Sequence, residues 1–455
     1  MTEIWGERVI GFLIFWGIWL LIPLIVDVST CLVYLINFLV NRNKKEEEKP
    51  DLVFFPFVTL VIPVHNSADT LKKCLNSIAN QTYPAEHIQI ICVNNGSEDN
   101  SFEVFNRFQN AHPEMSIAWN SLERAGKSIA LNAGLYSGSG TYMMNVDADT
   151  WLDQNAVMSV VKAFENDPTL AAATGSIRVD KELGEGSSFL DLINYCEVIE
   201  YILAFDVGRR YQDLKDAVFT LSGAFSMFRR DIILQSYLYQ TRTVSEDTDL
   251  TFNIRKAIEN SGGRIGFVAD ALAYVEPIES LDRLYSQRLR WQRGEIEVTG
   301  AYYSDTPNIF RALFDFVGRI LISDHTLAFI RMAWTFLLPF LYLLGYPMGV
   351  IILAFLGMYV CYLLLETISF YTAYKGSEPA YQKKMRLIWW IVFFMPLYRF
   401  IVYWFRIAGM VAVLTEEKSW KVQNPITQVK DILYDDYIDF VVKVQKMQRR
   451  DSNEQ

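Results

Sequence analysis

Three long apolar segments constrain the fold of this chain more than any other feature of its sequence. They are Val9–Val40, His325–Ala373 and Ile388–Leu414. The apolar core of a bilayer is about 30 Å thick, and a helix needs about 20 residues to cross it. The segments therefore have the lengths of one, two and one membrane-spanning helices, and the first is too long for the apolar part of a signal peptide. We expect transmembrane helices at both ends of the chain; a buried helical hairpin in a soluble protein is the alternative.

The charges that flank these segments predict their orientation. Arg42, Lys44 and Lys45 follow the first segment, and Glu3 and Glu7 precede it. Because basic residues accumulate on the cytoplasmic side of a membrane, the chain from residue 41 onward is expected in the cytoplasm. This pattern predicts a multi-pass protein of the plasma membrane with a cytoplasmic domain between its membrane regions. The side on which the C-terminal tail lies is left open, because the last segment fits either a span or an interfacial piece.

The residues between the membrane segments alternate between short apolar runs and amphipathic stretches. Such alternation predicts an α/β fold, a mostly parallel sheet flanked by helices. The run Ile88–Val93 is almost entirely apolar, as expected of a strand that is buried on both faces. Strands are expected at Phe57–Val64, Ile88–Val93, Ile117–Asn120 and Tyr142–Val146, and helices at Asp69–Asn80, Ser101–Gln109 and Lys127–Tyr136.

Charge and cysteine content exclude several classes of protein. The formal net charge is −10, which provides no general electrostatic attraction for nucleic acid. The five cysteines are scattered and form no CxxC pair, which argues against a disulfide scaffold or a zinc ribbon. A reducing compartment fits this pattern.

Two carboxylates follow the strand predicted at Tyr142–Val146. Asp147 and Asp149 are separated by one residue, and in an extended chain such residues point the same way. Ligands of open α/β sheets bind at the carboxyl ends of the strands. Hard oxygen ligands at this position suggest Mg²⁺ or Mn²⁺ bound to a diphosphate. A turn or a helix cap is the structural alternative.

Two further stretches carry charge that could serve chemistry. Ser245–Asp249 is acidic and precedes an expected helix at Leu250–Ile258, so it either caps that helix or supplies a general base. Ser280–Gly294 contains Arg288, Arg290 and Arg293 near Trp291. Arginines suit a leaving diphosphate, and a tryptophan ring can support a sugar. A solvated basic helix with one core tryptophan is the alternative.

These parts, in this order and between membrane segments, resemble the processive family 2 glycosyltransferases, which include cellulose, hyaluronan, chitin and poly-N-acetylglucosamine synthases. The resemblance implies a GT-A-like fold and a role for each matching motif. Asp147–Ala148–Asp149 matches the DxD motif, with Asp149 as the main metal ligand. Ser245–Glu246–Asp247 matches the (T/S)ED motif, with Asp247 as catalytic base and Glu246 as a second candidate catalytic carboxylate. Gln287, Arg290 and Trp291 match the QxxRW motif.

The resemblance also implies binding residues for the nucleotide and the acceptor. Lys127 follows a glycine in the loop that the family places near the nucleotide, and Ser222 and Gly223 lie where the family contacts the acceptor, as Trp291 does. One position departs from the family: Asn94 stands where an aspartate usually accepts a hydrogen bond from uracil, and an asparagine carbonyl can accept the same bond. The implied nucleotide-sugar ligands are Asn66, Asn94, Asn95, Lys127, Asp147, Gln287, Arg290 and Trp291.

The division of the chain follows from the same resemblance. Two apolar amphipathic stretches, Ser187–Tyr211 and Asn308–Ile320, are expected to hold the domain under the membrane. The expected parts are a membrane anchor (1–41), a charged linker (42–56), a GT-A domain (57–300), an interfacial region (301–325), a membrane region (326–414) and a tail (415–455).

The implied function is inverting transfer of a sugar, with N-acetylglucosamine as the first candidate, from a UDP-sugar to a growing polysaccharide. Expected partners are the UDP-sugar, a glycan acceptor, membrane lipid, and a partner subunit or a second copy that completes a channel. Two alternatives remain: a non-processive transferase that makes a lipid-linked glycan, and a degenerate scaffold without catalysis. The product of the first would extract into organic solvent, and the second would release no UDP.

Overall fold

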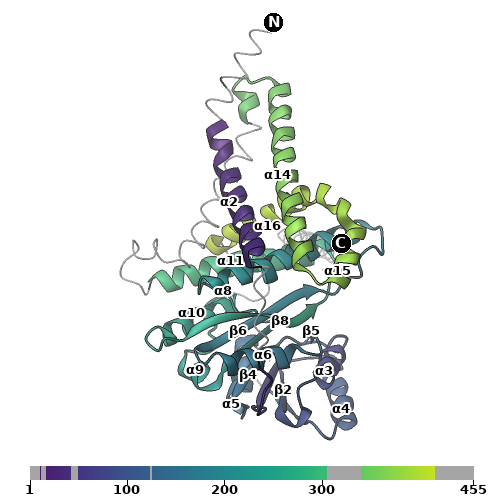
Figure 1. The fold of residues 1–455 in the computed structure, drawn as a ribbon, viewed down its shortest axis with the longest axis vertical. Coiled ribbons are helices and arrows are strands. Elements are labelled where there is room, and N and C mark those ends of the chain that lie inside the picture. The colour runs from purple at the N-terminus through teal and green to yellow at the C-terminus, as the bar shows by residue number, and fades with distance from the viewer. Residues whose placement is uncertain (1–10, 12–16, 42–49, 123–125, 305–339, 416–455) are drawn as a thin grey trace, which may run out of the picture.

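An eight-stranded sheet forms the base of the molecule in the computed structural model, which describes residues 11, 17–41, 50–122, 126–304 and 340–415 (Figure 1). The strand order across the sheet is β3-β2-β1-β4-β7-β6-β8-β5. The strands are β1 (Val58–Val64), β2 (Ile88–Asn94), β3 (Ser116–Ser121), β4 (Tyr142–Val146), β5 (Thr150–Leu152), β6 (Leu170–Val179), β7 (Phe225–Arg229) and β8 (Arg264–Val275).

The sheet is mixed but mostly parallel, as expected: six of its eight strands run in one direction, and β7 and β5 run in the other. β3, β2, β1 and β4 are parallel neighbours, as predicted for this stretch. β7 runs antiparallel to both β4 and β6, and β5 runs antiparallel to β8. The chain that leaves β6 therefore stays at the carboxyl edge of the sheet until β7 begins, instead of crossing back over a face. This excursion contains the helices nearest to the membrane segments.

Helices cover both faces of the sheet because its central strands are apolar on both sides. In β1, Leu60 and Ile62 belong to one buried cluster and Val61, between them, belongs to the other. α3, α4 and α6 pack on the first cluster, and α5, α9 and α10 on the second. Their bounds are α3 (Leu71–Ala79), α4 (Ser101–Ala111), α5 (Lys127–Ser137), α6 (Ala156–Asn166), α9 (Arg230–Gln235) and α10 (Glu246–Ile258), with a short turn η1 (Ala85–His87).

A layer of helices separates the sheet from the apolar helices that rise above it (Figure 1). α7 (Phe189–Ile202) continues through a π-helical turn, η2 (Leu203–Val207), into α8 (Gly208–Leu214). This confirms a helical stretch over most of Ser187–Tyr211. α11 (Leu281–Ser304) lies in the same layer and packs along α16 (Met395–Thr415).

Two of the described helices are long and apolar enough to cross a membrane, and both lie in the C-terminal part of the chain. They cover Met348–Gly376, which is α14, and Met395–Val413 within α16. The described part of α2 (Gly17–Asn41) contributes a shorter apolar stretch, Asp27–Val40, and lies beside α14. Spans at the N-terminal end therefore remain a prediction.

The last apolar segment is two elements instead of one. α15 (Pro379–Met385) leads into a tight helix, η3 (Arg386–Phe393), and α16 begins only at Met395. Proline is tolerated in the first turn of a helix, where its missing N–H is not needed, so Pro396 marks this start. The predicted stretch Asn308–Ile320, residues 42–49 of the linker and residues 325–339 of the second apolar segment lie outside the described residues.

Candidate active site

A cavity of about 2090 Å³ opens at the carboxyl edge of the sheet and continues between the apolar helices. Its walls come from β-strand ends, α10 and α11 below and from α2, α14 and α16 above. Eleven of the sequence-predicted site residues line it: Asn95, Lys127, Asp147, Asp149, Ser222, Gly223, Glu246, Asp247, Gln287, Arg290 and Trp291. The motifs, which are far apart in the chain, therefore face one common space.

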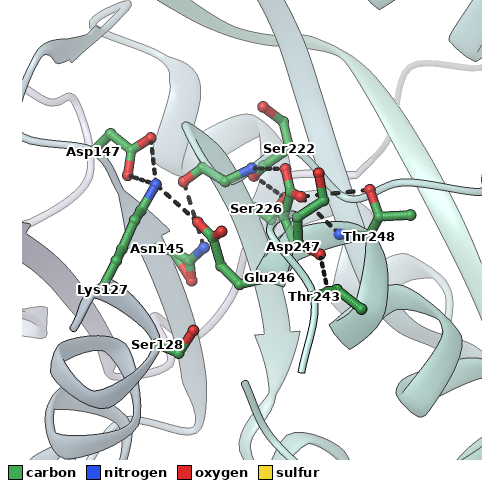
Figure 2. A network of polar contacts seen from close by, with 12 residues as sticks. Lys127, Ser128, Asn145, Asp147, Ser222, Ser226, Thr243, Glu246, Asp247 and Thr248 are labelled. Atoms are coloured by element: carbon green, nitrogen blue, oxygen red, sulfur yellow. Dashed lines mark hydrogen bonds and ion pairs between the residues drawn. The ribbon is translucent and has the colours of Figure 1, made fainter. Parts of the chain in front are cut away.

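Lys127 connects two of the motifs. It is the first residue of α5, and its Nζ lies 2.9 Å from Asp147 and 3.1 Å from Glu246 (Figure 2). Burial alone would lower the pKa of this ammonium group, but the two carboxylates outweigh burial and raise it above its usual value. Lys127 thus stays charged and holds the DxD turn next to the start of α10.

The two aspartates of the DxD motif have different surroundings. Asp147 binds Lys127, whereas Asp149 is exposed and makes no hydrogen bond or ion pair with any residue that the structure describes. The two residues lie in the turn between β4 and β5, so the extended-chain argument for their common direction is wrong, although both line the cavity. Burial and the nearby Asp149 raise the pKa of Asp147 to about 6, against the effect of Lys127.

A divalent cation fits this arrangement only together with a bound phosphate. The described residues contain no group of three or more His, Cys, Asp and Glu side chains that could hold a metal on their own. Mg²⁺ is commonly bound by one or two carboxylates, with substrate phosphates and water as the other ligands. The unpaired carboxylate of Asp149, exposed in the cavity, supplies a donor of that kind, and Asp147 lies two residues away.

Asp247 is held by two backbone N–H groups. Thr248 N donates to its Oδ1 at 2.7 Å and Gly223 N donates to its Oδ2 at 3.2 Å (Figure 2). α10 begins at Glu246, earlier than predicted, so Asp247 stands in the first turn of the helix. Burial, and next the charge of Glu246, raise the pKa of Asp247. Burial would also raise the pKa of Glu246, but Lys127 outweighs it and lowers that pKa.

The three arginines of the predicted basic helix have different partners, so they do not act together on a diphosphate. Arg293 is buried and pairs with Glu297 at 2.8 Å, outside the cavity wall. Arg288 is buried, pairs with Glu200 at 2.7 Å and lies 4.4 Å from the ring centre of Trp291. Arg290 lines the cavity and acts electrostatically on both Lys127 and Glu246. Arg288 also lines the cavity, although Glu200 engages its guanidinium, whereas Arg293 does not line it.

Gln287 and Trp291 share one face of α11, as the helical spacing predicts. Gln287 Nε2 donates to Tyr201 OH at 3.4 Å, and the ring of Trp291 packs against the rings of Tyr201 and Phe205. Both side chains line the cavity. α7 and η2 thus support the platform that these two residues form.

The asparagines at the ends of β1 and β2 mainly form hydrogen bonds within and between the neighbouring loops. Asn94 Oδ1 accepts from Ser97 N at 2.9 Å, Asn66 Oδ1 accepts from Glu98 N at 2.8 Å, and Asn95 Oδ1 accepts from Gly126 N. Of the three, only Asn95 lines the cavity. A role for Asn66 and Asn94 in nucleotide binding stays a prediction.

Several cavity residues had no signal in the sequence. They come from α7 to α8 and from the apolar helices, where patterning indicated only burial. Motif spacing could not find them, because they reach the cavity through tertiary packing. They include Arg209, Tyr201 and Tyr362.

Comparison with known proteins identifies the class of the domain. Residues 59–235 match the model of Glycosyl transferase family 2. The resemblance inferred from the motifs is thereby confirmed. The solved structure of the mannosyltransferase PcManGT from Pyrobaculum calidifontis, in complex with GDP-Man and Mn²⁺, superposes on this chain with a TM-score of 0.60 and 16% sequence identity. The match covers 86% of this chain and 96% of that chain. This likeness shows the fold, a GT-A-like mixed sheet flanked by helices.

The similar curated proteins are synthases of one polysaccharide. Poly-beta-1,6-N-acetyl-D-glucosamine synthase of Staphylococcus aureus (strain MSSA476) is 30% identical over 258 residues, which is 57% of this chain and 58% of that protein. The protein of the same name from Staphylococcus epidermidis is 29% identical over 242 residues, covering 53% of this chain and 55% of that protein. The chain thus matches little more than half the length of these relatives.

Proposed function

We propose that this protein is a membrane-embedded inverting glycosyltransferase that transfers N-acetylglucosamine from its UDP derivative to a growing polysaccharide. The observation that carries this proposal is the common cavity lined by Asp149, Asp247, Arg290 and Trp291. The family match supports glycosyl transfer, and the names of the staphylococcal relatives support the sugar. The continuation of the cavity between the apolar helices supports action at the membrane.

Asp247 is the proposed general base. Each of its oxygens already accepts one backbone hydrogen bond, which fixes the carboxylate and leaves lone pairs for an acceptor hydroxyl. A raised pKa makes this carboxylate a stronger base than an ordinary aspartate. It takes the proton of the acceptor hydroxyl as that oxygen attacks the anomeric carbon, which inverts the configuration there.

Positive charge on the donor side stabilises the departing UDP. Arg290 and the permanently charged Lys127 face the same part of the cavity and offer hydrogen-bond donors to diphosphate oxygens. Asp149, with Asp147, would hold Mg²⁺ or Mn²⁺, which supplies further positive charge to the diphosphate when bound. Trp291 and Gln287 form a platform for the sugar at the acceptor end.

The deciding experiment incubates membranes that contain the full-length protein with a panel of UDP-sugars and Mg²⁺ or Mn²⁺. We expect UDP release and a high-molecular-weight product from UDP-N-acetylglucosamine, and neither from the Asp247→Asn variant. A short product that extracts into organic solvent would instead indicate a lipid-linked transferase. No UDP release with any donor would refute the proposal.

A further inference from the structure

Arg209 is a buried cation in the cavity that the proposed mechanism does not use. Its residue is 4% exposed, and its Nη1 donates to Gln212 Oε1 at 3.2 Å. Its guanidinium carbon lies 5.5 Å from the ring centre of Phe219. Among the residues that the structure describes, Arg209 has no carboxylate within ion-pair distance. None of its nitrogens is among the fully buried, unpartnered polar atoms of the described residues, so its remaining N–H groups face the cavity, where oxygens of a ligand could accept from them.

The position of Arg209 separates it from the donor side of the cavity. It lies at the start of α8, directly after the π-helical turn η2. The charged and titratable groups that act on it are Asp247, Tyr34 and Glu295. Those that act on Lys127 are Asp147, Glu246 and Arg290, and Lys127 in turn acts on Asp247, so Asp247 interacts with both cations. Arg209 therefore lies on the side of Asp247 that faces α2 and α11, away from the proposed diphosphate site.

The local charge indicates the chemistry of the group that Arg209 would bind. Burial lowers the pKa of Arg209 to about 10, and Asp247 and Glu295 oppose this effect because both favour its charged form. A second anion placed there would lie against these two carboxylates and be repelled. A neutral ligand with several oxygens satisfies the free N–H groups without that repulsion. Sugar hydroxyls and the carbonyl of an N-acetyl group are such oxygens.

We propose that Arg209 is an acceptor-binding residue, whose buried guanidinium binds hydroxyl or carbonyl oxygens of the terminal acceptor sugar beside Asp247. This inference rests on the proposed glycosyl transfer and adds a specificity residue to the same cavity. Removing its hydrogen bonds should weaken acceptor binding roughly 10-fold or more, since a hydrogen bond to a charged group is stronger than a neutral one. Binding of the donor should not change.

The test measures donor and acceptor separately on purified full-length protein in lipid nanodiscs. The probe acceptor is a β-1,6-linked N-acetylglucosamine pentasaccharide, titrated at saturating UDP-N-acetylglucosamine, and slow hydrolysis of the donor is followed without acceptor. The variants are Arg209→Gln and Arg209→Lys. Arg210→Gln is the matched control, because Arg210 is on the same turn, 40% exposed, paired with Asp206 at 2.6 Å and outside the cavity wall.

We expect Arg209→Gln to raise the half-saturating acceptor concentration at least 10-fold, and Arg209→Lys to give a value between those of the wild type and Arg209→Gln. The KM for UDP-N-acetylglucosamine and the rate of donor hydrolysis should stay unchanged in both variants. The Arg210 variant should match the wild type. Equal changes in donor and acceptor parameters, or no change in either, would overturn the inference. If the wild type itself transfers no sugar from any donor, the proposed function fails instead. If Arg209→Gln does not fold, Arg209→Lys decides.

Discussion

Neutralising the adjacent carboxylates Glu246 and Asp247 should have opposite consequences for stability. The pKa of Asp247 is raised in the fold and that of Glu246 is lowered. A group with a raised pKa favours the fold only while it is protonated, so at neutral pH the Asp247 carboxylate costs stability. The Glu246 carboxylate has a lowered pKa, so it contributes stability that is lost only as the pH falls through that pKa.

The magnitudes follow from the contacts. In Asp247→Asn the amide oxygen can keep the bond from Thr248 N, and the amide NH₂ then faces Gly223 N, which loses its partner. This costs about 1–3 kcal/mol, but removal of a buried negative charge beside Glu246 offsets it. Glu246→Gln replaces an ion pair at 3.1 Å, with side chains 11% and 19% exposed, by a hydrogen bond from charged Lys127 to a neutral amide, a loss of about 1–2 kcal/mol.

The assays are thermal unfolding of the purified full-length protein at pH 7 and UDP release. Glu246→Gln should lower the unfolding midpoint by about 2–8 °C, at 2–4 °C per kcal/mol for a domain of this size. Asp247→Asn should leave the midpoint nearly unchanged or raise it, and reduce UDP release by about 10²–10⁴-fold. Wild-type activity should also fall when the pH is lowered. Because the pKa of Asp247 is raised, this fall should begin at a higher pH than it would for an aspartate with an ordinary pKa.

Two results would refute this reasoning. If Asp247→Asn released UDP within about tenfold of the wild-type rate, Asp247 would not be the base, because loss of a general base costs more. If both variants lowered the midpoint equally, the opposite electrostatic surroundings inferred for the two carboxylates would be wrong. Arg210→Gln, outside the cavity, serves as the control for nonspecific effects on folding.

Three further predictions concern the metal and two glycines. Asp149→Asn should raise the Mn²⁺ concentration needed for half-maximal UDP release more than Asp147→Asn does, because Asp147 is already paired with Lys127. Equal effects of the two substitutions would contradict this. Gly223→Ala should fold normally, because a Cβ there lies at an ordinary contact distance, 3.6 Å, from both Asp247 Oδ2 and Lys127 Nζ. The methyl group fills the space between these two side chains and should therefore lower turnover. Wild-type turnover would contradict this prediction. Gly294→Ala places a Cβ 1.9 Å from Ser245 Oγ and should lower the free energy of unfolding by about 1–3 kcal/mol, with some loss of activity. Adding Ser245→Gly should restore part of the stability, which unfolding midpoints would show.

The first half of the domain could be predicted from the sequence because each strand there is buried on both faces. The run Tyr142–Val146 has the predicted bounds, and β2 differs from its prediction by one residue. Apolar runs of this length, separated by amphipathic helices, define the parallel order without reference to distant residues. The motif residues after these strands could be predicted for the same reason, since the carboxyl ends of parallel strands meet at one edge.

The second half could not be predicted, because its geometry depends on contacts between distant segments. β7 has five residues and becomes a central strand only by pairing with β4 and β6. The arginines of α11 look equivalent in sequence, and only the glutamates around them distinguish their roles. Arg288 meets Glu200 of α7, whereas Arg293 meets Glu297 one turn further along its own helix.

The position of α11 explains why the site and the apolar helices form one unit. On one side, Arg290 and Trp291 face the cavity. On the other, Arg288 reaches Tyr398 OH at 3.3 Å, and Tyr398 OH donates to Glu200 at 2.6 Å, so α16 shares the support of the Trp291 platform. A Cβ at Gly409 would lie 2.8 Å from Leu289 O, which shows how closely the two helices approach. Because interiors this tightly packed transmit small shifts, a movement of α16 would displace Trp291. The acceptor sugar that we propose Trp291 supports would move with it, which ties the proposed chemistry to the membrane region.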